Sequence, residues 1–267
     1  MIAVLLVLSL LGVFWFFLWH GQEKILFQPP TNWVDPDAPG RVEYRAPDDQ
    51  LLVGYLIGDP LTAGVLLCFH GNADLTIWQL DWAEAVAVAT GRAVFLAEYR
   101  GYLSLGGVPT YATTRLDSEA AYTYLTSELG VPAARIAFFG HSLGSGVAAE
   151  LAEVHHPSAL VLQSPFKSAR AMARLMVSPP VEMLWHRVSR IHFDTQRVVA
   201  RLKVPVSVAH GKRDRIVPFR MGLQVYESAL SKGELLIVDK AGHNDLPSVG
   251  GEAYWKWIKA AVSPAMQ

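Results

Sequence analysis

One serine of the chain has glycine two positions before it and two positions after it, a spacing that suits a nucleophile. The motif is Gly140-His-Ser142-Leu-Gly144, between an apolar stretch typical of a strand and an Ala- and Gly-rich stretch typical of a helix. A strand that turns directly into a helix strains the residue at the apex, and flanking glycines remove the clash between neighbouring side chains. The sequence therefore predicts that Ser142 projects from the top of a sheet as a nucleophile.

A serine hydroxyl needs a general base, and the base needs a carboxylate that orients it. Two later strand-like segments are followed by suitable side chains, Asp214 after the first and His243 after the second. The chain order serine, acid, histidine is that of one large class of hydrolases. We therefore predict Asp214 as the acid and His243 as the base. Two other aspartates compete for the acid role, Asp239 close to its own strand and Asp194 in an inserted segment.

Acyl transfer also needs two backbone N–H donors for the oxyanion that forms in the transition state. The amide of Leu143, next to the nucleophile, is one candidate. The other is expected from the loop His70-Gly71-Asn72-Ala73, where we favour Asn72 and Ala73 is possible. Three further histidines, His70, His141 and His210, are expected to pack or to form hydrogen bonds near the site.

The segments that would position these residues alternate between strand and helix. Their apolar runs are continuous, which is typical of parallel strands buried on both faces. Strands are expected at 42–46, 51–57, 64–69, 93–98, 135–139, 159–163, 204–209 and 234–238, with helices near 74–90, 112–129, 143–155, 219–231 and 250–262. The pattern predicts an α/β fold over 42–262, a doubly wound and mostly parallel sheet in one domain that opens with an antiparallel hairpin.

About forty residues separate the strand that ends at Gln163 from the next one, more than a crossover helix needs. We interpret 166–203 as a lid over the carboxyl ends of the strands, where α/β sheets bind ligands. Eight of its residues are basic and only Glu182 and Asp194 are acidic, with methionines, leucines and Trp185 interleaved. Two interpretations remain open. Either the arginines pair with carboxylates on a solvated surface, or the lid rests on an anionic membrane.

The first twenty residues form an uncharged, almost wholly apolar stretch after Met1, long enough to cross a bilayer as a helix. We predict a transmembrane anchor at 1–20 and a proline-rich linker at 21–41. A cleavable signal peptide and a buried helix are the alternatives, but no basic residue precedes the apolar run and no small-x-small cleavage site follows it. Basic residues follow the segment and none precedes it, which weakly favours a cytoplasmic catalytic part.

Composition excludes several classes of function. The formal net charge is −1, which argues against nucleic acid as a partner. The single cysteine, Cys68, lies in an apolar run and is expected to be buried. The sequence has no metal-ligand cluster and no phosphate-binding loop, so we expect neither a metal nor a cofactor.

Together these motifs resemble the Bem46-type α/β hydrolases, a family that includes the membrane-tethered ABHD13 and ABHD17 serine hydrolases. The resemblance covers most of 42–262, and one difference is Leu103, where many relatives have glycine. It is carried by His70-Gly-Asn-Ala, Glu98-Tyr-Arg-Gly-Tyr102, Gly140-His-Ser-Leu-Gly-Ser, Gln163-Ser-Pro-Phe166, His210-Gly-Lys-Arg-Asp214-Arg-Ile-Val-Pro218 and Gly242-His-Asn-Asp-Leu246. The resemblance implies an α/β-hydrolase fold and a metal-free ester or thioester hydrolase with the triad Ser142, Asp214 and His243.

The sequence thus predicts cleavage of an acyl ester or thioester through an acyl-enzyme on Ser142, with lipid-like or acylated substrates near a membrane. A peptidase or amidase on the same triad is an alternative, because a triad does not choose between esters and amides. A non-catalytic binding protein on the hydrolase fold is the alternative from another class, and it would be expected to have lost a triad residue.

Overall fold

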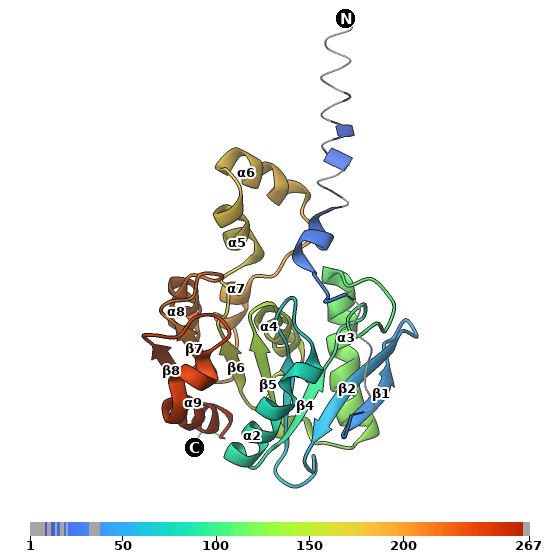
Figure 1. Cartoon of the computed structure of the whole chain (residues 1–267), viewed down its shortest axis with the longest axis vertical. Helices are drawn as coiled ribbons and strands as arrows, with labels where there is room; N and C mark the ends of the chain where they lie inside the picture. Colours follow the sequence, from blue (N-terminus) through green and yellow to red (C-terminus); the bar gives the residue numbers. More distant parts are fainter. Residues whose placement is uncertain are drawn as a thin grey trace, which may run out of the picture.

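An eight-stranded sheet runs through the centre of the molecule (Figure 1). The structure is a computed structural model, which describes residues 9, 12, 13, 15, 16, 19, 21–31 and 38–263. In spatial order the strands are β1 (Arg41–Arg45), β2 (Leu51–Ile57), β4 (Ala93–Ala97), β3 (Val65–Phe69), β5 (Ile136–His141), β6 (Leu160–Gln163), β7 (Val206–Gly211) and β8 (Lys232–Val238). The strands β1, β2 and β4 pair antiparallel, and every pairing from β4 to β8 is parallel.

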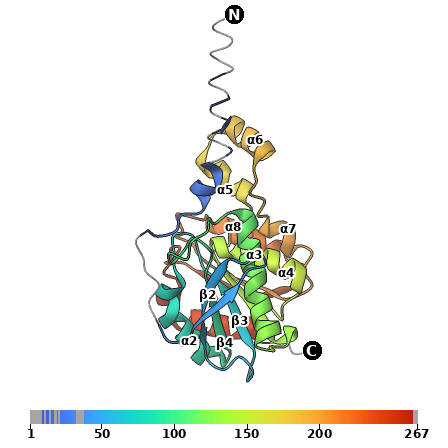
Figure 2. The ribbon, with the colours of Figure 1, turned by 90° about the vertical axis from the view of Figure 1, so that its right-hand side faces the viewer.

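Helices cover both faces of the sheet (Figures 1 and 2). They are α2 (Leu80–Thr90), α3 (Tyr111–Thr123), α4 (Leu143–His155), α5 (Ala169–Met176), α6 (Pro179–Val188), α7 (Thr195–Val199), α8 (Phe219–Ser228) and α9 (Leu246–Val262), with short turns η1 (Thr76–Gln79), η2 (Tyr124–Glu128) and η3 (Ala133–Arg135). One face carries α2 and α9, and the other carries α3, α4, α7 and α8. All residues of β3, β4, β5, β6 and β7 are buried, so the predicted doubly wound α/β sheet with an opening hairpin is confirmed.

The predicted lid leaves the sheet at the end of β6, as expected, but it does not close over the strand ends. Its helices α5 and α6 stand away from the sheet (Figures 1 and 2). Ser168 caps α5 through the N–H of Ala171, and Pro179 occupies the first turn of α6. No residue of 166–203 lines the cavity that contains Ser142. We therefore call 166–203 the insertion below.

The residues just before the hydrolase domain pack against it, although the sequence predicted a linker at 21–41. Residues 21–26 are helical, and the side chain of Phe27 is buried in the core. Most of the predicted anchor at 1–20 lies outside the described residues. Among the residues that the structure describes, no helix is both long enough and apolar enough to span a bilayer.

Candidate active site

Ser142 occupies the sharp turn between β5 and α4. Its backbone has φ 51° and ψ −115°, a strained conformation for a residue other than glycine. A Cβ on Gly140 would overlap the carbonyl of Gly144, and a Cβ on Gly144 would overlap the carbonyls of Phe69 and His70. The two glycines of the motif are therefore required because the neighbouring backbones approach too closely for any side chain.

Asp214 and His243, which follow neighbouring strands, are brought together as predicted. The Nδ1 of His243 lies 2.7 Å from Oδ2 of Asp214. This contact requires that Nδ1 carries the proton, and it leaves Nε2 free of a proton and able to accept one from a serine hydroxyl. The other two aspartates lie elsewhere: Asp239 pairs with Lys212 at the surface, and Asp194 caps α7.

The carboxylate of Asp214 is held by three further donors. Its Oδ1 accepts the N–H groups of Ile216 and Val217 at 2.8 Å each, and its Oδ2 accepts Nε2–H of His210 at 3.1 Å. Burial raises the pKa of Asp214, but the hydrogen bonds from His210 and His243 outweigh burial, and the net pKa lies well below its usual range. The acid therefore stays ionised at any pH at which the protein would work.

The main chain of His243 is held by the side chains of Ser164 and His141. Its carbonyl accepts the hydroxyl of Ser164 and faces Nε2 of His141, each at 3.3 Å. The rings of His141 and His243 are 5.1 Å apart. Burial, followed by the charge of His243, lowers the pKa of His141 to about 4. His141 is therefore neutral near pH 7, and it places no positive charge beside the ring of His243.

The two predicted oxyanion donors lie on segments adjacent to Ser142. Leu143 is the first residue of α4, where backbone N–H groups have no carbonyl partner within the helix. The loop of Asn72 passes so close that a Cβ on Gly71 would contact Cβ of Ser142 at 3.4 Å. Ala73, the alternative donor, has a left-handed φ of 53° and lines the same cavity.

A buried histidine contacts the main chain of this loop. The Nε2 of His70 lies 2.6 Å from Oε1 of Glu98, and its Nδ1 lies 2.7 Å from the carbonyl of Gly71. Burial lowers the pKa of His70, but the charge of Glu98 and its hydrogen bond outweigh burial, so the pKa is raised. Both ring nitrogens face oxygen acceptors, and the ring can donate to both only as an imidazolium. The other oxygen of Glu98 accepts the N–H and the hydroxyl of Thr76.

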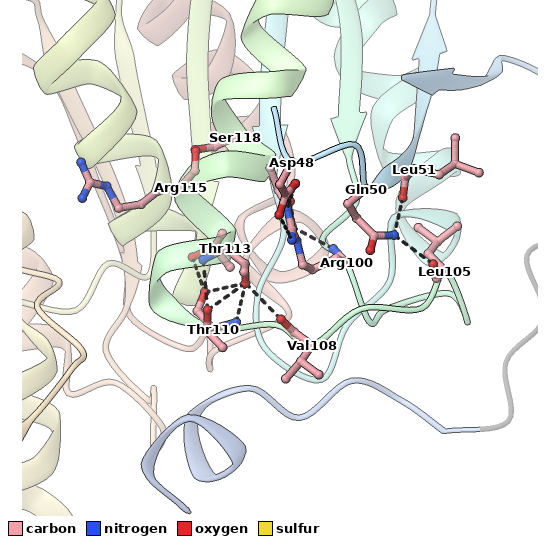
Figure 3. A network of polar contacts seen from close by, with 12 residues as sticks. Asp48, Gln50, Leu51, Arg100, Leu105, Val108, Thr110, Thr113, Arg115 and Ser118 are labelled. Carbon is pink, nitrogen blue, oxygen red and sulfur yellow. Dashed lines mark hydrogen bonds and ion pairs between the residues drawn. The ribbon is translucent and has the colours of Figure 1, made fainter. Parts of the chain in front are cut away.

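The loop after β4 is held by a buried arginine (Figure 3). Arg100 binds both carboxylate oxygens of Asp48, at 2.6 and 3.0 Å, and Oδ1 of Asp117 at 2.9 Å. Farther along the loop, Gln50 donates to the carbonyl of Leu105. Leu103, where many relatives have glycine, adopts a left-handed φ of 47°. The network fixes this loop, from which Tyr102 donates its hydroxyl to Oδ1 of Asn72 at 3.0 Å.

Ser142 and His243 open into one cavity of about 600 Å³, a size typical of small-molecule sites. Its walls are mostly apolar or aromatic, and they combine residues from the turns after β3, β5 and β8. The lining residues are Gly71, Asn72, Ala73, Asp74, Trp78, Gln79, Trp82, Phe139, His141, Ser142, Gln163, Ile216, His243, Asn244 and Pro247. Within the described residues, no group of His, Cys, Asp or Glu side chains could hold a metal ion.

Sequence reasoning missed two parts of this arrangement. It placed His210 near the site without identifying it as a partner of Asp214, although the four-residue spacing from a strand end was the available signal. It also assigned Asn72 only a backbone role, whereas the side chain of Asn72 binds main-chain groups of Leu26 and Gln28. No local pattern in the sequence signals a contact across 44 residues.

Comparison with known proteins agrees with this geometry. An uncharacterized protein of Mycobacterium tuberculosis is 32% identical in an alignment of 243 positions that covers 86% of this chain and 83% of that protein. Alpha/beta hydrolase domain-containing protein 17B of Homo sapiens is 28% identical over 198 residues, 74% of this chain and 66% of that protein. The chain is related to the α/β-hydrolase domain-containing proteins. No family model matches it.

Solved structures share the fold. The esterase Pf2001 of Pyrococcus furiosus superposes with a TM-score of 0.68 at 21% identity, covering 88% of this chain and all of that one. Such a low identity establishes the fold alone, an α/β-hydrolase fold with a mostly parallel sheet. The strand ends of this chain carry Ser142, Asp214 and His243 in the order predicted from the sequence.

Proposed function

We propose that this protein is a serine hydrolase that cleaves acyl esters or thioesters through a covalent acyl-enzyme on Ser142. One observation carries the proposal: a strained serine shares a cavity with a histidine whose Nδ1 is bound by a buried carboxylate at 2.7 Å. This arrangement supplies a nucleophile, a base of the correct tautomer and a permanently ionised orienting group, which are the parts that acyl transfer needs.

In the proposed reaction, Oγ of Ser142 attacks the acyl carbon while Nε2 of His243 takes its proton. The carbonyl oxygen becomes an oxyanion that accepts the N–H groups of Leu143 and Asn72. The intermediate collapses as the bond to the alcohol or thiol breaks, and His243 returns the proton to that leaving group. Water then attacks the acyl-enzyme with His243 as base, which releases the acid and restores Ser142. Asp214 stays ionised throughout and stabilises the imidazolium.

The direct test is to compare the full-length protein with Ser142→Ala. Turnover would be measured on p-nitrophenyl esters of increasing acyl length beside the matching acyl-thioesters, together with labelling by a fluorophosphonate probe. We expect Ser142→Ala to lose labelling and to lose turnover by about a millionfold, as removal of a triad nucleophile does. Undiminished labelling of the Ser142→Ala protein would refute the assignment of the nucleophile.

Adding p-nitroanilides to the same substrate panel separates the alternatives. Faster cleavage of p-nitroanilides than of matched esters would favour an amidase or peptidase on the same triad. A wild-type protein that binds acyl compounds but neither labels nor turns over would favour the non-catalytic binding protein.

We further propose that the protein works at a lipid surface, from which the acyl chain enters the cavity. The insertion and the helical residues before Phe27 lie side by side (Figures 1 and 2). Both carry exposed apolar side chains, including Leu175 at 55%, Met176 at 71% and Ile25 at 60% exposure. The basic residues of the insertion support the proposal less than the sequence suggested, because Arg170 and Arg174 pair with Glu182 within the insertion.

Turnover of esters embedded in lipid vesicles tests this second proposal. The full-length protein would be compared with a variant carrying Leu175→Ser and Met176→Ser, on neutral and on anionic vesicles. We expect the double variant to turn over vesicle-embedded esters several-fold more slowly while a soluble short-chain ester is cleaved at the wild-type rate. Equal loss on both substrates would instead indicate a damaged fold.

A further inference from the structure

The side-chain amide of Asn72 makes all its hydrogen bonds to other segments of the chain. Its Oδ1 accepts the backbone N–H of Gln28 at 2.9 Å and the hydroxyl of Tyr102 at 3.0 Å. Its Nδ2 donates to the backbone carbonyl of Leu26 at 2.5 Å. Two donors meet the oxygen and a carbonyl meets the nitrogen, so the orientation of the amide is fixed by its partners. The side chain of Asn72 therefore binds main-chain groups of the N-terminal segment.

That segment, residues 22–28, is itself held on the domain, and we call it the strap. Glu23 accepts the backbone N–H of Tyr111 at 3.3 Å and binds Nη2 of Arg190 at 2.9 Å. Gln22 accepts the backbone N–H of Arg190 at 2.9 Å. Phe27, between the two main-chain groups that bind Asn72, is buried to 3% exposure. The strap is therefore tied to α3, to the insertion and to the loop of Asn72.

We propose that the strap positions the oxyanion-stabilising N–H of Asn72, and that Asn72 acts through its side chain as the positioning residue. The inference rests on the proposed acyl transfer. A trans peptide is planar, with its C=O and N–H pointing in opposite directions. His70 fixes the Gly71 carbonyl at one end of the Gly71–Asn72 peptide, and the strap fixes the Asn72 side chain at the other. Together they set the direction of the Asn72 N–H.

The test removes one strap donor without removing a side chain from the site. In the full-length protein, Gln28→Pro deletes the N–H that Oδ1 of Asn72 accepts. Phe27 already lies outside the helical residues 21–26, so the proline does not interrupt the helix. The matched control is Gln28→Ala, which retains the N–H and removes an exposed side chain whose contact is the carbonyl of Ile25.

We expect Gln28→Pro to lower kcat for a short-chain p-nitrophenyl ester by about tenfold with KM within about twofold, because a misplaced oxyanion donor weakens transition-state binding selectively. Gln28→Ala should show none of this loss. A boronic acid, whose tetrahedral serine adduct places an oxygen in the same position, should lose affinity in proportion to kcat. The acid limb of the pH profile should not move, since the strap does not touch His243.

Asn72→Asp is the second variant, because it keeps Oδ1 and replaces the donor to Leu26 by an oxygen. We expect it to reproduce the kcat loss of Gln28→Pro. Wild-type kcat in both variants, or a lowered melting temperature with kcat intact, would overturn the inference and reduce the strap to a structural role. That result would leave the proposed function standing. If the wild-type protein shows no hydrolysis that depends on Ser142, the proposed function fails and the inference fails with it.

Discussion

The two sides of the candidate site are held in different ways. On the acid–base side, every partner of Asp214 comes from the segments around β7 and β8: His210, Ile216, Val217 and His243. On the oxyanion side, the loop after β3 is held by Glu98 through His70, by Tyr102 and by the strap. The first side is complete within the globular domain, whereas the second depends on residues that precede its first strand.

The two sides also differ in the charge that burial has to accommodate. The acid–base side holds an anion, Asp214, whose pKa is lowered by the donors around it. The oxyanion side holds the buried pair of His70 and Glu98, in which burial lowers the pKa of His70 but the charge and hydrogen bond of Glu98 outweigh it and raise the pKa. Because a lowered acid pKa and a raised base pKa contribute to stability in opposite pH ranges, the two sides can be told apart by titration.

The largest expected effect is on turnover and comes from the acid. Asp214→Asn should lower kcat by about 10³- to 10⁴-fold, because an amide can donate to Nδ1 and so favours the wrong tautomer of His243. Asp239→Asn is the control, since Asp239 is exposed and pairs with Lys212. Steady-state kinetics on one p-nitrophenyl ester would decide. A large loss of kcat in Asp239→Asn, together with little loss in Asp214→Asn, would mean that the acid is misassigned.

Next in size is the acid dependence of stability. The folded pKa of Asp214 is depressed, so its stabilisation is fully present above the unfolded pKa near 4 and is lost as the pH falls toward the folded value. We expect the difference in unfolding free energy between wild type and Asp214→Asn to be on the order of 2 kcal/mol at pH 6. It should shrink steadily between pH 4 and pH 2 in urea titrations. A difference that does not change with pH would contradict the assignment of the charge.

On the oxyanion side, the contribution to stability should change with pH in the opposite direction and by a smaller amount. The folded pKa of His70 is raised, so its stabilisation is fully present below the unfolded pKa near 6.5 and is lost as the pH rises through the folded value. The unfolding free energy of the wild type should exceed that of Glu98→Gln by on the order of 1 kcal/mol at pH 5.5, and this difference should narrow toward pH 9. If the stability differences of Glu98→Gln and Asp214→Asn from the wild type changed with pH in the same direction, the two sides could not be distinguished in this way.

The same contrast explains how much the sequence could predict. The acid–base side follows from strand ends that meet at one edge of a parallel sheet, so spacing alone placed Asp214 and His243. The helices lie close to the predicted ranges, although α9 begins at Leu246, before the predicted start near 250, and is kinked at Gly251. The strap and the His70–Glu98 pair depend on tertiary contacts between segments whose local patterns are those of a linker and of two ordinary strand ends. Such contacts have no periodic signature, and neither does the direction in which the insertion leaves the sheet.

The smallest expected effect concerns His141, which lies between the two sides. It contacts the carbonyl of His243, and a Cβ on Gly71 would lie 3.1 Å from its Nδ1. Because burial lowers its pKa to about 4, His141 is neutral above about pH 5 and the acid limb of kcat/KM should follow a single ionisation. His141→Gln should therefore leave the midpoint of that limb within about 0.3 units and lower kcat less than about threefold, since the lost contact is long and uncharged. If His141 instead carried a proton at neutral pH, its removal would relieve repulsion on the His243 imidazolium, and the midpoint would move upward. A pH profile of the two proteins therefore tests whether His141 is neutral beside His243.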